Sequence, residues 1–143
     1  MKKISFNEFC LSENLNLSAL RKDVLLILFN KKKPMGAYEI LETLKKKRST
    51  AEPPTVYRVL KWLMDVNLIH KIETQNKYVF CSSFKNESVH HKNILLICKK
   101  CDESVELSDN QVSDSLKKFA LKQRIQIDDS IIEIKGICAE CAE

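Results

Sequence analysis

The sequence has few residues that interrupt regular structure, with two glycines and three prolines in 143 residues. It also lacks any apolar run of about 18 to 20 residues, the length that a transmembrane helix requires, so we expect no membrane partner. Residues 1–8 contain no apolar stretch of the kind that forms a secretory signal. We therefore expect a cytoplasmic protein, whose reducing surroundings favour metal binding by cysteine over disulfide formation.

Charge is unevenly distributed along the chain. The formal net charge is +5, with 44% hydrophobic and 30% charged residues, which is ordinary for a soluble globular protein. Residues 1–80 carry 15 Lys and Arg against 8 Asp and Glu, a balance of +7, whereas residues 81–143 carry 9 against 11, a balance of −2. The basic half suggests a polyanionic partner such as nucleic acid. The alternative is a solvated surface rich in lysine.

Four of the six cysteines form two CxxC pairs, Cys98–Cys101 and Cys138–Cys141. Each pair can direct two thiolates at one point, and two such pairs make the tetrahedral sulfur site that zinc prefers. A site of this kind has no open coordination position, so it stabilises a small domain and performs no catalysis. The alternative is a pair of disulfides or unrelated thiols, but the repeated spacing in a short chain favours zinc.

The first half of the chain predicts three helices followed by a strand hairpin. Apolar residues recur there with the period of a helix, then alternate as in strands. The expected elements are helices over 17–30, 37–47 and 53–66, and strands over 68–73 and 77–81. This is the order of a winged helix, and we place the first domain at residues 1–82.

The second half predicts a small α/β domain over residues 83–143, after a polar segment at 82–92. Its expected elements are strands over 94–98, 103–107 and 130–135, a helix over about 110–124, and a cysteine pair after the first and last strands. Together the two halves predict an α+β fold, in which the structural zinc closes the second domain.

The helix expected over 53–66 has one apolar face and one basic face. Arg58 and Lys61 lie opposite its apolar residues, as in the second helix of a helix-turn-helix motif that enters the major groove. Arg58 suits a bidentate contact with guanine, and Lys61 suits a phosphate. The alternative is an ordinary amphipathic surface helix. Trp62 lies on neither face, and we expect it to pack against the helix 17–30.

A second group of metal donors is scattered around the end of the first domain. It comprises His70, Cys81, one of the adjacent residues His90 and His91, and Glu106. Two imidazoles, a thiolate and a carboxylate suit a four-coordinate divalent metal, and the thiolate favours zinc over iron or manganese. The alternative is a buried free cysteine with surface histidines, and spacing alone favours that alternative.

Five ordered segments carry a family resemblance. They are AEPPTVYRVL at 51–60, IHKIE at 69–73, YVFC at 78–81, ICKKC at 97–101 and GICAEC at 136–141. In this order, and across roughly residues 17–141, the chain resembles the ferric uptake regulator family, most closely its zinc uptake regulator branch. The resemblance implies a zinc-responsive transcriptional repressor that binds double-stranded operator DNA as a metal-loaded homodimer and controls zinc uptake genes, without a small-molecule substrate.

The resemblance also implies roles for individual residues. It places DNA contacts at Tyr38, Tyr57 and Arg58, and a C-terminal domain that dimerises. It makes the site of Cys98, Cys101, Cys138 and Cys141 structural. It assigns a regulatory zinc to His70, Cys81, His91 and Glu106, with His91 preferred over His90 because it precedes Cys98 by seven residues, as in the zinc branch.

Some positions depart from the family pattern. The segment before the first cysteine pair lacks the H-x-D element that the iron and peroxide branches usually carry, which weakens an iron-responsive interpretation. Asp102 stands where a glycine often follows the first pair. The turn at 74–76 has no glycine, so Asn76 must take any left-handed conformation that the turn requires.

Other functions remain as alternatives to a zinc-responsive repressor. An enzyme is disfavoured because four protein ligands leave zinc no open position, and no H-x-E motif precedes the cysteine pairs. A thiol sensor would use oxidation of Cys10 or Cys81 to end DNA binding. An iron- or peroxide-responsive repressor of the same family would differ mainly in its metal or its signal.

Overall fold

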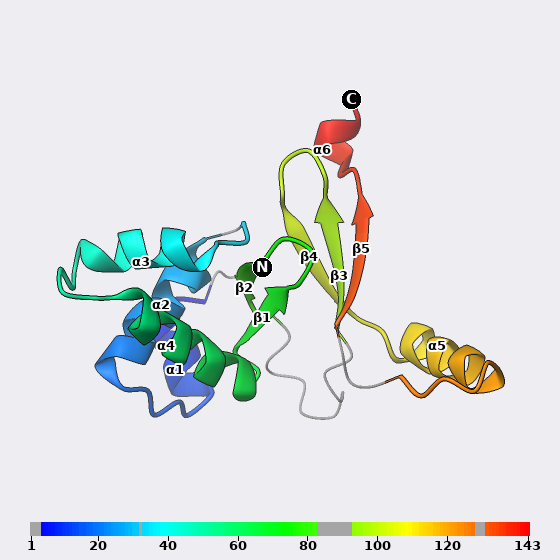
Figure 1. Cartoon of the computed structure of the whole chain (residues 1–143), viewed down its shortest axis with the longest axis horizontal. Coiled ribbons are helices and arrows are strands. Elements are labelled where there is room, and N and C mark those ends of the chain that lie inside the picture. Colours follow the sequence, from blue (N-terminus) through cyan, green and yellow to red (C-terminus); the bar gives the residue numbers. More distant parts are fainter. Residues whose placement is uncertain (1–3, 32, 83–92, 128–130) are drawn as a thin grey trace. The chain divides into compact units, whose positions relative to one another are not determined.

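The structure is a computed structural model of the whole chain, and it describes residues 4–31, 33–82, 93–127 and 131–143. The chain divides into two compact units, Met1–Cys81 and Ser82–Glu143 (Figure 1). No helix among the described residues has the length and apolar character needed to cross a bilayer. Helices and small sheets make up both units, so the expected α+β fold is confirmed. The domain boundaries and the role of each domain remain predictions.

The N-terminal unit contains four helices and a two-stranded sheet. The elements are α1 (Phe6–Ser12), α2 (Ala19–Asn30), α3 (Ala37–Lys45), α4 (Pro53–Asp65), β1 (Ile69–Ile72) and β2 (Lys77–Phe80). Proline occupies the first turn of α4, where its missing N–H group costs no hydrogen bond. The three helices and two strands expected here lie within two residues of their predicted bounds.

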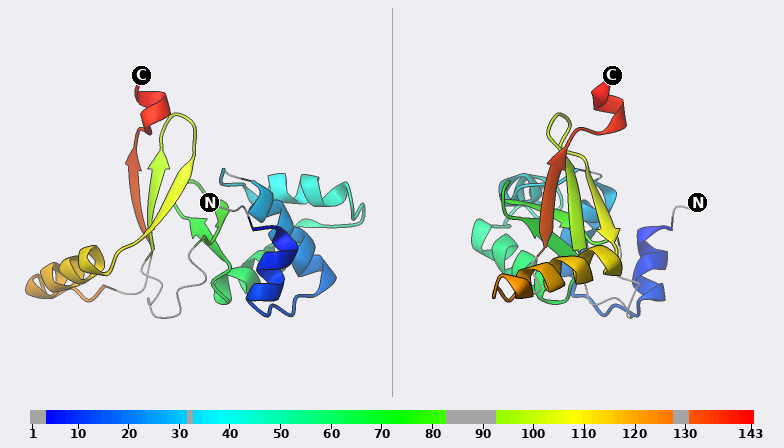
Figure 2. Two further views of the ribbon diagram at one scale, coloured as in Figure 1. Left: turned by 180° about the vertical axis from the view of Figure 1, so that it is seen from behind. Right: turned by 90° about the vertical axis from the view of Figure 1, so that its right-hand side faces the viewer.

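Helix α1 was not anticipated, and it precedes the three expected helices. A capping box defines its start: Ser5 Oγ accepts a hydrogen bond from the Glu8 N–H, and Glu8 accepts one from the Ser5 N–H. The sequence pattern Ser-x-x-Glu is the signal that could have revealed it. Phe6 and Phe9 of α1 pack on Phe29 of α2, and Figure 2 shows the two helices side by side.

The core of the N-terminal unit forms where α2, α3 and α4 pack together and against the hairpin. Its fully buried side chains include Leu25, Leu28, Ile40, Leu44, Leu60, Leu63 and Ile72. Each such side chain contributes roughly 1.5–3 kcal/mol through burial. Asp23 of α2 also pairs with Lys47 and Arg48, just beyond α3, at 2.5 and 2.7 Å. This unit therefore has a closed core of its own.

The hairpin pairs β1 with β2 in an antiparallel register that sets Ile69 opposite Phe80. Asn76 in the connecting turn has a φ of +51°, so the left-handed conformation expected there is confirmed. A further bridge joins Met35 to Tyr78 on the outer side of β2. The hairpin thus brings Cys81, which follows β2, back toward the start of β1, where the Cys81 N–H donates to the Leu68 carbonyl at 2.9 Å.

The C-terminal unit is built on a three-stranded sheet. Its elements are β3 (Asn93–Cys98), β4 (Ser104–Ser108), α5 (Asn110–Lys122), β5 (Ile132–Gly136) and α6 (Ala139–Ala142). The strand order is β4-β3-β5, with β3 antiparallel to β4 and parallel to β5. The parallel pair requires a crossover connection, and α5 lies on it. The short helix α6 was not anticipated.

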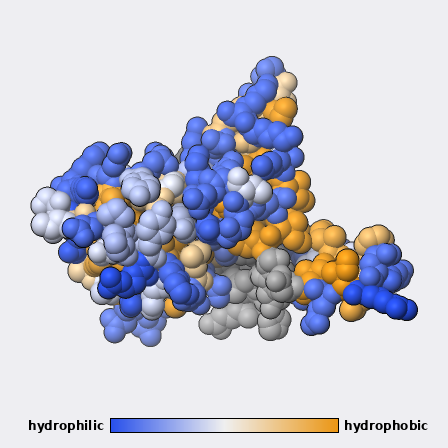
Figure 3. All heavy atoms as spheres, viewed as in Figure 1, coloured by the Kyte–Doolittle hydropathy of each residue, from blue (hydrophilic) through white to orange (hydrophobic). Residues whose placement is uncertain are grey.

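One face of this sheet, together with most of α5, leaves large apolar side chains exposed. They are Leu96, Val105, Leu107, Val112, Leu116, Phe119, Leu121 and Ile134, and the nearby Ile125 and Ile137, which follow α5 and β5, are exposed as well. Figure 3 shows apolar atoms gathered along the sheet and on α5. A groove of about 290 Å³ runs along the sheet face, lined by Leu96, Val105 and Ile134 among others. An exposed apolar surface of this extent marks an interaction site.

Candidate metal centres and nucleic-acid interface

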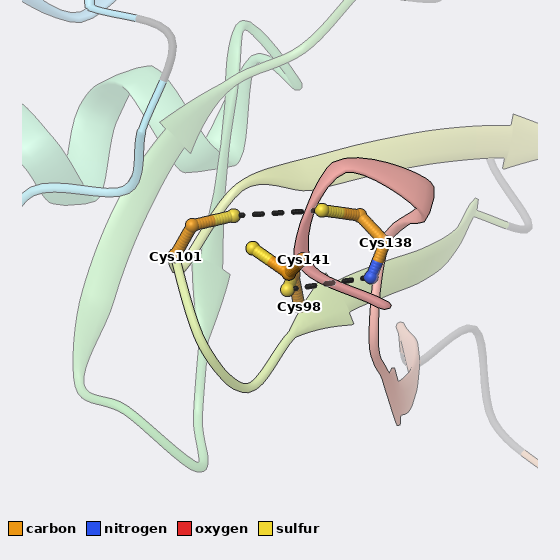
Figure 4. Close-up of side chains that lie close together, drawn as sticks. All are labelled: Cys98, Cys101, Cys138 and Cys141. Atoms are coloured by element: carbon orange, nitrogen blue, oxygen red, sulfur yellow. Dashed lines mark hydrogen bonds between the residues drawn. The ribbon is translucent and has the colours of Figure 1, made fainter. Parts of the chain in front are cut away.

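The two CxxC pairs come together at one end of the C-terminal sheet. Parallel pairing sets Cys98, the last residue of β3, opposite Gly136, so that Cys138 follows two residues later. The Sγ atoms of Cys98, Cys101, Cys138 and Cys141 all lie within 4.8 Å of one another. Figure 4 shows the four side chains directed toward a common centre. The predicted sulfur cluster is therefore present in the geometry of the fold.

The sulfur spacing suits zinc better than it suits a disulfide. The Sγ atoms of Cys101 and Cys138 are 3.8 Å apart. Four sulfurs bound tetrahedrally at ~2.3 Å from zinc lie about 3.8 Å from one another. A disulfide requires a sulfur–sulfur distance of ~2.05 Å, and all four cysteines are free thiols. The alternative of two disulfides is therefore disfavoured for these residues.

Backbone hydrogen bonds shape each cysteine pair. After the first pair, Asp102 takes a left-handed φ of +59° and its N–H donates to the Cys98 carbonyl at 3.0 Å. Aspartate thus adopts the conformation for which glycine is the usual residue. In the second pair, Cys138 caps α6, and its N–H donates to Cys98 Sγ at 3.4 Å. Lys100 Nζ donates to the Cys141 carbonyl at 2.7 Å, which joins the two pairs.

The thiols of Cys98 and Cys141 differ in acidity. Hydrogen bonds from the backbone N–H groups of Cys138, Cys101 and Lys100 lower the pKa of Cys98 to about 6. A hydrogen bond with the Cys138 thiol, followed by burial, raises the pKa of Cys141 to about 12. The thiols cannot all ionise together, because the thiolates repel one another in a small volume. A divalent cation at the centre removes that repulsion, so zinc binding would release protons.

The residues of the second predicted metal group come from both units, and some of them lie outside the residues that the structure describes. In the N-terminal unit, His70 and Cys81 are both buried, and a ring nitrogen of His70 lies within 4.8 Å of Cys81 Sγ. In the C-terminal unit, Glu106 of β4 accepts hydrogen bonds from the Ser82 N–H and Oγ at 3.0 and 3.1 Å. His90 and His91 lie outside the described residues. A single site with all four ligands therefore remains a prediction.

The predicted DNA contacts lie on the exposed side of α3 and α4. Tyr38, near the start of α3, is 65% exposed, and Tyr57 on α4 is 43% exposed. Arg58 and Lys61 are also exposed. The apolar face of α4 is buried as expected, through Val56, Val59, Leu60 and Leu63. Helix α4 thus presents aromatic and basic side chains to solvent, while its opposite face anchors it in the core.

Two contacts modify the predicted interface. Lys61 Nζ lies 3.4 Å from Asp65 Oδ2, one helical turn along α4, so a carboxylate partly offsets its charge. Trp62 lies against Arg21 of α2, with the guanidinium carbon 3.7 Å from the ring centroid. The expected packing of Trp62 on the helix 17–30 is confirmed. The sequence pattern did not predict that Arg21 is the partner of Trp62, because the two residues lie far apart along the chain.

Comparisons with known proteins agree with these features. The family model described as "Ferric uptake regulator family" matches residues 12–135. The zinc uptake regulation protein of Escherichia coli strain K12 is 32% identical over 136 residues, covering 95% of this chain and 78% of that protein. A solved zinc uptake regulator complexed with zinc and DNA is 31% identical, with a TM-score of 0.81, covering 95% of this chain and 89% of that chain. A holo XcZur crystal structure is 36% identical, with a TM-score of 0.78, covering 93% and 91% of the two chains.

Proposed function

The chain belongs to the ferric uptake regulator family, and from this premise we propose that it is a zinc-responsive transcriptional repressor. It binds operator DNA as a metal-loaded homodimer and controls zinc uptake genes. The observation that carries the proposal is the likeness, over 95% of the chain, to a zinc uptake regulator complexed with zinc and DNA. The four-cysteine cluster supports zinc as a cofactor. The family is one of transcription regulators, and we propose no enzymatic activity.

A structural zinc ion is held by Cys98, Cys101, Cys138 and Cys141. It supplies a tetrahedral crosslink between the end of β3 and the start of α6. The residues that prepare the site are Asp102, through its left-handed conformation, and Lys100, through its bond to the second cysteine pair. Because the four thiolates fill the coordination sphere, this zinc has no position for water or substrate.

A regulatory zinc ion is held by His70, Cys81, His91 and Glu106. Support comes from the proximity of His70 to Cys81, and from the hydrogen bonds that Ser82, the next residue after Cys81, donates to Glu106. These bonds orient a carboxylate in the way that outer-shell donors orient metal ligands. The nitrogen and sulfur donors favour zinc over iron.

Zinc at the regulatory site restrains the angle between the two predicted domains, 1–82 and 83–143, because each contributes ligands. In a homodimer this angle sets the separation of the two α4 helices. Both helices can bind DNA only when they reach major grooves about 34–36 Å apart. A zinc affinity about 100-fold higher for the competent arrangement supplies ~2.7 kcal/mol toward it.

DNA is read by the exposed side of α4, assisted by α3. Arg58 makes a bidentate contact with a guanine edge, and Tyr38 and Tyr57 contact the DNA beside it. Lys61 contacts phosphate, which requires it to leave Asp65 or share its charge with it. The surplus of positive charge in residues 1–80 adds affinity that weakens steeply with salt.

The homodimer forms through the exposed apolar surface of the C-terminal unit. Leu96, Val105 and Ile134 on the sheet and Phe119 on α5 leave water when a second copy covers them. A symmetric dimer brings the same patch of each copy together. Burial of such a surface supplies the association energy, because apolar area removed from water stabilises by about 25 cal/mol per Å².

The decisive experiment counts zinc per chain and then follows fluorescence anisotropy of a labelled AT-rich inverted-repeat duplex in buffers of fixed free Zn²⁺ or Fe²⁺. We expect two zinc ions per chain, with tight DNA binding appearing only as the second is filled. Cys81→Ala should keep one zinc and lose the zinc response, whereas Cys10→Ser should behave as wild type. One zinc per chain, with DNA binding that responds only to iron or to peroxide, would refute the proposal.

A further inference from the structure

A basic groove lies beside the expected DNA-reading surface of α4. It has a volume of about 330 Å³ and is lined by Ser18, Leu20, Arg21, Thr55, Arg58 and Val59. Two arginines and two residues with hydroxyl groups are among its lining residues, which include no acidic residue. We call this feature the α2–α4 groove. Its chemistry suits an anion with several acceptor oxygens.

Arg21 is held in this groove by stacking. Its guanidinium carbon lies 3.7 Å from the centroid of the Trp62 ring. Stacking occupies a flat face of the guanidinium and leaves the N–H groups at its edge able to donate. The ring therefore fixes the orientation of the charge without using its hydrogen-bonding capacity. Such preorganisation reduces the entropy lost when an anion binds.

Arg21 differs from Arg48, which pairs with a carboxylate of α2. Arg48 Nε lies 2.7 Å from Asp23, a carboxylate of the same protein. Arg21 has no carboxylate partner among the residues that the structure describes, although it is half-buried. A partly desolvated cation without a counter-charge favours an anionic ligand from outside the protein.

The hydroxyl groups of the groove add donors. Ser18 Oγ accepts the Arg21 N–H at 3.4 Å as the cap of α2, and its own hydrogen can still donate. Thr55 lies on the first turn of α4, one turn before Val59. We propose that Arg21, stacked on Trp62, and Thr55 bind a backbone phosphate of the DNA whose bases Arg58 reads. This inference rests on the proposed function.

DNA fits this groove better than a small anion because the groove adjoins the helix that would enter the major groove. A phosphate at Arg21 fixes the position of α4 along the duplex, yet carries no sequence information itself. Arg21 is thus a positioning residue, and its mutational signature differs from that of Arg58. Loss of Arg21 should weaken binding to every duplex by the same factor, whereas loss of Arg58 should weaken operator binding most.

The test measures the affinity of zinc-loaded protein for an operator duplex and a scrambled duplex, between about 50 and 200 mM salt. Arg21→Ala should weaken both duplexes equally, by about tenfold for each groove. It should also reduce the slope of log affinity against log salt by about 1 per groove, hence about 2 for a homodimer. Lys31→Ala, which removes a charge at the far end of α2, should change the slope much less.

A double mutant tests the stacking. Trp62→Leu should weaken both duplexes by a smaller factor than Arg21→Ala, and it should cause no further loss when Arg21 is already alanine. Arg21→Lys keeps the charge without the planar stack, so this variant should retain the wild-type salt slope. Its DNA affinity should no longer depend on whether residue 62 is tryptophan or leucine. Thermal unfolding of each variant confirms that it is folded, and Arg21→Gln replaces Arg21→Ala if the alanine variant is not.

Several outcomes would overturn the inference. The first is a salt slope of DNA binding for Arg21→Ala equal to that for Lys31→Ala. The second is a loss of affinity in Arg21→Ala that is confined to the operator duplex. The third is full additivity of the affinity losses caused by Trp62→Leu and Arg21→Ala. Inorganic phosphate can be titrated against the fluorescence of Trp62, the single tryptophan. If phosphate changes the fluorescence saturably while Arg21→Ala leaves the salt slope of DNA binding unchanged, the groove is a small-anion site and the proposal is wrong. If wild-type protein binds neither duplex, the proposed function fails and this inference fails with it.

Discussion

The two units differ in how completely they bury their large apolar side chains. The N-terminal unit buries its large apolar residues, and Leu25, Leu60 and Leu63 are at most 1% exposed. In the C-terminal unit, Leu95 and Ile97 of β3 are buried, but Phe119 is 65% and Ile137 is 55% exposed. A small unit that covers so little of its own apolar surface needs further stabilisation from metal or association. The first unit therefore carries its own core, whereas we expect the second to depend on zinc and on a second copy.

Removal of the structural zinc should produce the largest difference between the units. Cys98→Ser, or a strong chelator, should unfold the C-terminal unit, since structural zinc contributes about 10–16 kcal/mol in zinc-finger peptides. The N-terminal unit should stay folded, because no cysteine of the cluster lies in its core. Trp62 fluorescence reports on the N-terminal unit alone, and circular dichroism reports on both.

Cys10 offers a matched control for the effect of zinc removal on the two units. Cys10→Ser changes a half-buried cysteine of α1 and should leave both unfolding transitions and the zinc content as in wild type. If chelation abolished the Trp62 transition as well, the N-terminal unit would not be independently stable. The comparison between the units would then be wrong.

Disruption of the exposed apolar surface should have the next largest effect. Phe119→Glu places a charge within the proposed dimer surface and should cost roughly 2–4 kcal/mol of association energy. Sedimentation at micromolar concentration should then detect monomer, while the Trp62 transition keeps its wild-type midpoint. Ser115→Glu adds the same charge to an exposed position of α5 and should leave the protein dimeric. A dimeric Phe119→Glu protein would show that another surface joins the copies.

Periodic patterns in the sequence predicted most of the fold. Helices α2 to α4 and the hairpin followed from apolar spacing and from proline at the start of α4, and Asn76 followed from the absence of glycine in the turn. Helix α1 was missed because its two buried phenylalanines lie in a polar segment too short to show a period. Its capping residues, Ser5 and Glu8, were the available signal.

The candidate sites were predictable only in part. Repeated CxxC spacing gave the sulfur cluster, because two residues between cysteines impose local geometry whatever the rest of the chain does. The stack of Arg21 on Trp62 depends on how α2 packs against α4, and no local pattern encodes that contact. The Ser82 donors to Glu106 likewise depend on a pairing between residues 24 positions apart.

The smallest predicted effect is a pH-dependent loss of stability in the N-terminal unit when Asp23 is replaced. Burial raises the pKa of Asp23, but hydrogen bonds and charges from Lys47 and Arg48 outweigh it and hold the pKa below its usual range. A carboxyl group with a lowered folded-state pKa stabilises the fold above its unfolded pKa of ~3.9, and this stability is lost as pH falls through the folded value. Asp23→Asn should therefore destabilise the N-terminal unit by about 1–2 kcal/mol at neutral pH, and by less as pH falls below ~4.

Asp65→Asn provides the matched comparison for the Asp23 pair. Both Asp65 and its partner Lys61 are largely exposed, with 61% and 74% of their side-chain surfaces accessible, so their pair should contribute about 0–1 kcal/mol. Urea unfolding followed by Trp62 fluorescence from neutral pH to about pH 3 measures both variants. Equal losses for the two variants at neutral pH would show that burial of Asp23 does not strengthen its pair. Removal of an ionised carboxylate must have less effect once the wild-type group is protonated. A loss of unfolding free energy in Asp23→Asn that does not change with pH would therefore assign the effect to packing.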